Sequence, residues 1–221
     1  MRKSLGRLAA TMVLATVITG GAAAPAAAQD TVRGKQAGDI VLGFGAIGVL
    51  PSGGGHVDAI GGRPQASDSA SPQLDLTYFM VPQVALNLIA ATSRHDISVR
   101  GSALGDVNLG HVWVLPPTLT LQVHPFPTSR FSPYAGAGLN VTFFYGEGGS
   151  RTPPVRRVMV DTAPGFALNL GTDYEIAPNW LANIDVKKLL LRPEASVNSG
   201  LLHARVNLDP CVVGASVRYR F

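Results

Sequence analysis

Residues 180–190 read Trp180-Leu-Ala-Asn-Ile-Asp-Val-Lys-Lys-Leu-Leu190, and the spacing of charge in this stretch decides the fold. Trp180, Ile184 and Val186 alternate with Asn183, Asp185 and Lys187. Successive side chains of a strand point to opposite faces, so an alternation of period two predicts a β-strand. The strand has one continuous apolar face, and charges stand in the middle of the other.

The same alternation recurs along the chain. It predicts eight strands at about Asp39 to Ile47, Gln73 to Met80, Val84 to Ile97, Asp106 to His124, Pro133 to Tyr145, Ala163 to Glu175, Trp180 to Leu190 and Arg205 to Phe221. Pro116 and Pro117 interrupt the fourth, and proline cannot donate to a sheet ladder, so we expect a bulge or bend there. Strands of this spacing without helical periodicity favour an all-β chain.

Charges on the polar face separate this pattern from a soluble sandwich. Asp75, Asp173, Asp185 and Lys187 stand mid-strand, opposite an unbroken apolar face. Apolar side chains turned to lipid and polar ones turned to a lumen account for both faces. Short turns near Val81, Pro125 and Ile176 alternate with long segments at 48–72, 146–160 and 191–204, although the connection at 98–105 is short. The sequence therefore predicts an eight-stranded antiparallel transmembrane β-barrel.

The two ends of the chain fit export to an outer membrane. Arg2, Lys3 and Arg7 precede an apolar run from Leu8 to Ile18, and a small-residue stretch ends at Ala28. Such a run is too short for a transmembrane helix, so residues 1–28 are expected to be a signal peptide and residues 29–221 the barrel domain. The chain ends on Phe221, and a terminal aromatic residue on a last strand predicts recognition by the barrel-assembly machinery in a Gram-negative cell outer membrane, reached through the periplasm.

Composition and motifs argue against other classes of function. Without the three basic residues of the signal, 15 Lys and Arg face 14 Asp and Glu, so no nucleic-acid partner is expected. The five histidines and the single cysteine, Cys211, form no ligand-spaced pair, so neither a metal nor a cofactor is predicted. Gly43 to Gly48 matches G-x-G-x-x-G, but Pro51 follows and no helix can begin, so glycines that make room in a narrow lumen explain it better.

Strand parity gives the candidate lumen lining. The inward-facing residues that we expect to line the passage or touch a ligand are Asn87, Ile89, Thr120, Gln122, Thr142, Phe144, Leu181, Asn183, Asp185 and Lys187. No catalytic residue is assigned: Ser93, His95, Asp96 and Ser98 gather near a predicted rim, but His95 and the adjacent Asp96 point apart.

Two further groups concern the membrane. Tyr78, Tyr134, Tyr174, Trp180 and Tyr219 fall near strand ends, where an interfacial aromatic girdle competes with ordinary packing as the explanation. Arg151, Arg156 and Arg157 lie in a long external segment. They either pair with lipopolysaccharide phosphates or stay solvated.

Several blocks, in order, resemble the OmpW family: Asn87 to Thr92, Leu115-Pro-Pro-Thr-Leu-Thr-Leu-Gln122, Tyr134 to Phe144, Asn183 to Lys188, and Leu208-Asp-Pro with the end Tyr219-Arg-Phe221. The likeness runs from residue 37 to the end and is weakest in 48–72. It implies an eight-stranded outer-membrane barrel with a narrow, partly apolar lumen, linked to uptake of small hydrophobic molecules with lateral release into lipid. Cys211 stands where family members often have tryptophan.

Three hypotheses of function follow. The first is a passive channel for small hydrophobic molecules, surrounded by outer-membrane lipid and lipopolysaccharide. The second is a structural or stress-response barrel with a plugged lumen, which the Asp185 and Lys187 pair favours because inward charges can close a narrow lumen. The third is a lipid-modifying enzyme that uses the serine and histidine near the rim.

Overall fold

The structure is a computed structural model that describes residues 32–52, 55–57, 61–103, 105–149, 158–160, 162–191, 194–197, 202–206 and 209–221. The predicted signal peptide, residues 1–28, and the three arginines at 151, 156 and 157 lie outside these ranges. None of the described residues form a helix long and apolar enough to cross a membrane.

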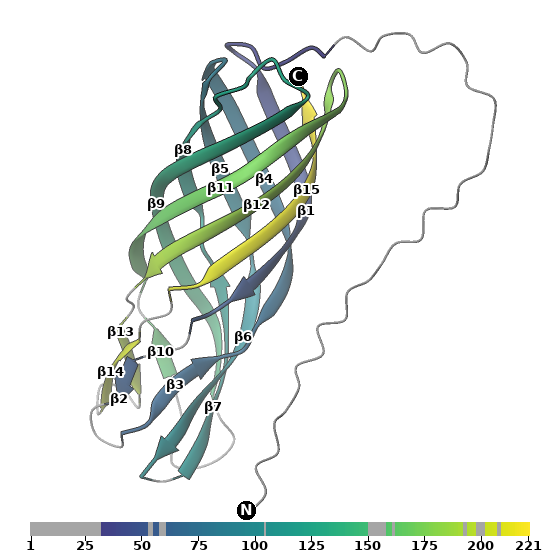
Figure 1. Cartoon of the computed structure of the whole chain (residues 1–221). Helices are drawn as coiled ribbons and strands as arrows, with labels where there is room; N and C mark the ends of the chain where they lie inside the picture. Colours follow the sequence, from purple (N-terminus) through teal and green to yellow (C-terminus); the bar gives the residue numbers. More distant parts are fainter. Residues whose placement is uncertain are drawn as a thin grey trace, which may run out of the picture. The chain divides into compact units, whose positions relative to one another are not determined.

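Eight antiparallel strands close into a barrel (Figure 1). In order around the wall they are β1 (Ile40–Leu50), β4 (Ser69–Val81), β5 (Val84–Ala91), β8 (Thr118–Val123), β9 (Phe131–Gly149), β11 (Ala163–Ala177), β12 (Trp180–Leu191) and β15 (Cys211–Arg220). The pairing of β15 with β1 joins the two ends of the chain, and the pairing of β9 with β11 completes the circle. The predicted fold class is confirmed.

Shorter strands extend the barrel wall where the long connections lie. β6 (Ser93–Ser102) continues β5, β7 (Gly105–Leu115) leads into β8, and β3 (Arg63–Ala66) pairs with β6. Four more strands form a separate sheet in the order β10, β13, β14, β2: β2 (Gly55–Val57), β10 (Val158–Val160), β13 (Glu194–Val197) and β14 (Leu202–Val206). We call this the loop end of the barrel and the opposite one, with the short connections, the turn end.

The predicted inversion of polar and apolar faces is confirmed, although β1 also presents apolar residues, Val41, Ile47 and Val49, to the lumen. On β11, Phe166 is 65% exposed while Asn169, three residues on, is 1% exposed. A barrel leaves no backbone edge unpaired in lipid, so its outer surface can be apolar at no cost in unsatisfied hydrogen bonds. Asp75, Asp173, Asp185 and Lys187 all lie buried in the lumen, as parity predicted.

Several of the predicted strand limits were wrong, and the second strand, for example, begins at Ser69 rather than Gln73. The last strand begins at Cys211 rather than Arg205, because Pro210 has no amide to donate and Asp209 turns the chain at a φ of +24°. Residues 202–206 instead pair within the separate sheet. The third predicted strand is interrupted at Thr92, and the fifth continues past Tyr145 to Gly149.

Four of the five residues predicted for an aromatic girdle face the outer wall, and their place at the membrane interface stays a prediction. Trp180, Tyr219 and Phe221 pack edge to face at the turn end, with ring centroids 5.0 and 4.9 Å apart, and Tyr78 and Tyr174 are exposed on the outer wall. Tyr134 is the exception. Its ring is buried in the lumen, where the amide of Asn183 donates to its hydroxyl at 3.0 Å, because its parity on β9 is that of the polar residues.

Glycine makes room for inward side chains where the lumen is most crowded. A Cβ on Gly43 of β1 would lie 2.6 Å from Cγ of Asp75 and 2.9 Å from Cγ of Arg218. These separations are closer than packed carbon atoms tolerate. The first residue of the G-x-G-x-x-G sequence therefore serves packing, as the sequence analysis inferred.

Candidate functional site

The lumen is layered, and its loop-end layer is apolar. Inward side chains of β1, β5, β11, β12 and β15 form what we call the upper apolar cluster: Ile47, Val49, Ala91, Ala167, Leu189, Leu191 and Val212. All stand in the halves of their strands that lead to or from the long connections. A second and smaller apolar group, Val41, Phe79, Ala85 and Leu181, lies at the turn end. The wide apolar part of the lumen is therefore at the loop end.

A hydrogen-bonded polar layer lies on the turn-end side of the upper apolar cluster. Gln122 donates to Asn169 at 2.8 Å, Asn169 donates to Asp185 at 3.1 Å, and Lys187 forms an ion pair with Asp185. Gln122 lies on β8, Asn169 on β11, and Asp185 and Lys187 on β12, so the two amide contacts join different strands while the ion pair runs along β12. The layer narrows the passage with groups that partner one another.

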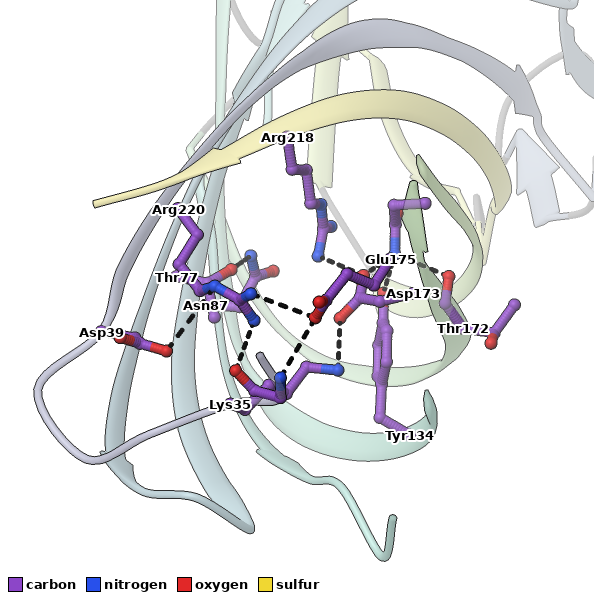
Figure 2. A network of polar contacts seen from close by, with 12 residues as sticks. Lys35, Asp39, Thr77, Asn87, Tyr134, Thr172, Asp173, Glu175, Arg218 and Arg220 are labelled. Atoms are coloured by element: carbon purple, nitrogen blue, oxygen red, sulfur yellow. Dashed lines mark hydrogen bonds and ion pairs between the residues drawn. The ribbon is translucent and has the colours of Figure 1, made fainter. Parts of the chain in front are cut away.

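Buried ion pairs fill the lumen closer to the turn end (Figure 2). Arg218 of β15 contacts Asp75 of β4 and Asp173 of β11, each at 3.2 Å. Asp173 also binds Lys35 at 3.1 Å, and Arg220 binds Glu175 at 3.0 Å. All six side chains are largely shielded from solvent, and we call them the charged floor: Lys35, Asp75, Asp173, Glu175, Arg218 and Arg220.

The segment before β1 takes part in this closure. The backbone amides of Arg33 and Gly34 donate to Glu175 at 2.7 and 3.2 Å, and Arg220 donates to the carbonyl of Gly34 at 2.6 Å. The amide of Lys35 donates to the carbonyl of Pro127. Burial lowers the pKa of the Lys35 ammonium group, against the opposing attraction of Asp173. The chain therefore lies across the turn end and carries a buried lysine into the lumen.

The barrel wall is broken near the upper apolar cluster. The pairing of β5 with β8 ends at Ile89 and Thr118, and the pairing of β6 with β7 resumes in the same register at Ser93 and Val114. Ala90–Thr92 therefore form no ladder pairs with Leu115–Pro117, and we call this interval the ladder gap. Pro116 and Pro117 have no amide hydrogen, so their strand cannot donate there. A bulge or bend was predicted at these prolines; the structure instead shows an interruption of the sheet, with the same register on either side.

Nine of the ten predicted lumen residues are buried inside the barrel: Asn87, Ile89, Thr120, Gln122, Thr142, Leu181, Asn183, Asp185 and Lys187. Phe144 is half-buried, where β9 passes beside β7. Of these, Gln122 and Asp185 meet through Asn169, whereas Leu181 belongs to the turn-end apolar group. That any of them touches a ligand stays a prediction.

The prediction omitted the residues that close the lumen. Arg218 and Arg220 follow Ser216 at the parity of the polar face, so alternation was enough to place them inside. Lys35 precedes the first strand and carries no periodic signal. The sequence signal for the charged floor was therefore the match between inward arginines on the last strand and inward carboxylates on β4 and β11.

Near the rim the structure brings two of the four gathered residues together. His95 lies 2.9 Å from the Ser93 hydroxyl and 2.6 Å from the carbonyl of Ser67, measured from its two ring nitrogens. Asp96 is exposed and points away, so no serine, histidine and aspartate triad forms. Within the described ranges, no three His, Cys, Asp or Glu side chains are grouped to hold a metal ion.

An eight-stranded barrel with lipid-facing apolar side chains and a polar lumen is an integral protein of the Gram-negative outer membrane, surrounded by lipid and lipopolysaccharide. The OmpW family model matches residues 36–221, so the chain belongs to the OmpW family. It is 38% identical to the uncharacterized outer-membrane protein y4mB of Sinorhizobium fredii over 79% of this chain and 76% of that one.

Two further comparisons also match outer-membrane proteins. The chain is 32% identical to Outer membrane protein W of Escherichia coli, over 84% of this chain and 90% of that protein. It superposes on the crystal structure of the outer membrane protein OprG from Pseudomonas aeruginosa with a TM-score of 0.80 and 28% identity, covering 86% of this chain and 99% of that one. All three relatives are named as outer-membrane proteins.

Proposed function

We propose that this protein is a passive outer-membrane channel for small hydrophobic molecules, which enter at the loop end and leave sideways through the ladder gap into lipid. One observation carries the proposal: the apolar part of the lumen adjoins a break in the wall, while the charged floor blocks the way down. Ala91 belongs both to the upper apolar cluster and to the ladder gap. The family resemblance supports the same class of cargo.

Energetics favour the lateral route over a route along the barrel axis. An apolar molecule that moved toward the periplasm would have to separate Arg218 from Asp75 and Asp173, and breaking a buried ion pair is strongly unfavourable. Movement through the ladder gap breaks no backbone hydrogen bond, because none joins the two strands there. The apolar molecule then gains free energy on entering lipid.

The test restores the missing backbone donors. Pro116→Thr with Pro117→Val gives both positions an amide, with a small polar side chain toward the lumen and a β-branched one toward lipid. We expect the ladder to close, because the registers on either side of the gap already agree. Uptake of naphthalene by Gram-negative cells that lack their own OmpW-family protein should then fall to the rate of cells with an empty vector.

A proline at the turn end supplies the control. Pro82→Ala removes a proline from the short connection between β4 and β5, far along the strands from the ladder gap, and should leave uptake as in the wild type. Heat-dependent migration on gels verifies that each barrel is folded. Wild-type uptake by the folded proline-free variant would contradict the lateral route.

A plugged structural barrel is the second candidate, and the charged floor is the observation that favours it. It predicts that expression of the wild-type protein leaves naphthalene uptake at the empty-vector rate.

Contact of Phe221 with the barrel-assembly machinery remains part of the proposal. The Phe221 side chain is exposed, and its amide donates to the carbonyl of Ile40 on β1.

A further inference from the structure

We propose that the lumen wall beside the ladder gap is a selectivity site that presents hydrogen-bond acceptors and takes apolar compounds bearing a hydroxyl group, with Ser93 Oγ as its central acceptor. This inference rests on the proposed function and names its preferred class of cargo. The site lies on the route between the upper apolar cluster and lipid, since Ser93 follows Ala91 on the same inward face and pairs with Val114.

The Ser67 carbonyl determines which member of the Ser93 and His95 pair donates and which accepts. The Ser67 carbonyl can only accept, so Nδ1 of His95 carries the hydrogen of that 2.6 Å contact. Nε2 without a hydrogen then accepts from the Ser93 hydroxyl at 2.9 Å. Ser67 is itself held in place, because its amide donates to the Asp96 carbonyl and its hydroxyl accepts from the Asp96 amide. Ser93 Oγ therefore faces the lumen with lone pairs and no free hydrogen.

Polar side chains on the other side of the gap also donate their hydrogens to neighbouring oxygens. Thr118 donates to the carbonyl of Pro116 at 2.9 Å, and Asn140 donates to the carbonyl of Pro117 and to Thr118. Thr142 donates to the side-chain carbonyl of Asn140 at 2.6 Å.

On the β4 side, Ser71 donates to the carbonyl of Thr92. The carbonyls of Thr92 and Pro116 thus take up side-chain donors on the lumen side of the gap, and the Pro117 carbonyl also accepts from the amide of Val141. The hydroxyls of Thr92 and Tyr145 bond to each other.

Such a wall discriminates by the kind of polar group a ligand carries. A ligand hydroxyl donates to Ser93 Oγ while its apolar body stays in the cluster. A carboxylate brings only acceptors, meets the lone pairs of Ser93 and loses its hydration without compensation. A plain hydrocarbon fits the apolar cluster but leaves Ser93 Oγ without a ligand partner.

Three ligands of one ring system test this directly: naphthalene, 2-naphthol and 2-naphthoate, given to cells that express the full chain. For the wild type we expect faster uptake of 2-naphthol than of either other compound. Ser93→Ala should lower the ratio of 2-naphthol to naphthalene uptake by about threefold to tenfold, the value of one hydrogen bond. Ser93→Thr keeps the hydroxyl and should keep most of the ratio.

A second variant distinguishes loss of the Ser93 acceptor from a general disruption of the lumen wall. His95→Leu frees the Ser93 hydrogen to donate, so uptake of 2-naphthoate relative to 2-naphthol should rise instead of falling. If naphthalene uptake exceeds the empty-vector rate but Ser93→Ala leaves the 2-naphthol ratio unchanged, the selectivity site is wrong and the channel stands. If no compound enters faster than with an empty vector, both fail. Hydrolysis of 2-naphthyl acetate by the wild type and not by Ser93→Ala would overturn the site by making Ser93 a nucleophile.

Discussion

The turn half and the loop half of this barrel are built by different means. At the turn end, side chains close the lumen, and Arg218 alone joins three strands through Asp75 and Asp173. At the loop end, the backbone opens the wall, because Pro116 removes a donor on the side of β5 and β6 and Pro117 removes one on the side of β9. The comparison shows that the charged floor closes one half of the lumen and the ladder gap interrupts the wall of the other, which is the arrangement that the proposed function requires.

The two halves also differ in what holds them. Ion pairs in the charged floor are shielded from water, so each charge depends on its partners for the solvation it lost on burial. The upper apolar cluster depends on burial of hydrocarbon, whose contribution is graded with the apolar area that is buried. We therefore expect single substitutions to have their largest effect on stability in the turn half.

The sharpest test of that difference is Arg218→Met. Methionine keeps an unbranched side chain but leaves Asp75 and Asp173 without their shared cation, so the free energy of unfolding should fall by about 3–5 kcal/mol. Urea unfolding of the protein in phospholipid vesicles measures it. Adding Asp75→Asn should recover most of the loss, because Asp173 keeps Lys35 as a partner and the carboxylate left without a cation is then gone.

Arg94→Met is the matched control. Arg94 and Asp96 approach to 3.6 Å, but their side chains are 50% and 67% exposed, and exposed pairs contribute little. A loss for Arg218→Met no larger than for Arg94→Met would contradict the idea that buried charges hold the turn half.

Strand parity predicted most of the barrel because lipid leaves no other solution. Asp75, Asp185 and Lys187 had to point inward once their neighbours on the strand faced hydrocarbon. The prolines that make the ladder gap were also visible in the sequence. Their effect on particular neighbours was not, since it depends on the register of two ladders that only the folded barrel brings together.

What parity could not predict lies outside regular strands or depends on distant partners. Lys35 precedes β1 and reaches Asp173 only because the chain crosses the turn end. Residues 202–206 alternate like a barrel strand, yet they pair with β13 and β2, because Pro210 separates them from β15. The Ser93 and His95 contact was within reach of parity, but the Ser67 carbonyl that fixes their roles comes from a distant segment.

A smaller effect should appear at Lys35, where burial and Asp173 oppose each other. Burial lowers the pKa of the ammonium group in the folded protein, so the unfolded chain binds more protons as the pH approaches the ordinary lysine value. Stability contributed at this position therefore rises with pH in the window just below that value. The free energy of unfolding of the wild type, minus that of Lys35→Met, should increase from pH 8 toward pH 10.

The opposite slope at Lys35 would mean that attraction to Asp173 outweighs burial. Either sign is read from urea unfolding in vesicles at constant ionic strength. Lys188→Met serves as the control for a general alkaline effect, since Lys188 is only half-buried and binds Ser52 at the loop end.

The smallest effect is expected at Asp106, in the hairpin of β6 and β7 beyond the eight barrel strands. The backbone amide of Gly101 donates to this carboxylate at 2.9 Å and holds its pKa below the ordinary value, and Arg100, at 3.1 Å, adds to that. A depressed carboxylate pKa favours the folded hairpin at neutral pH, and this contribution is lost as the pH falls through the folded pKa. Arg100→Gln should leave a depressed pKa in a carbon-13 titration of Asp106 by NMR, because the Gly101 amide remains. A return to the ordinary aspartate value would instead assign the shift to the arginine, and the exposed hairpin would then depend on an ion pair as the charged floor does.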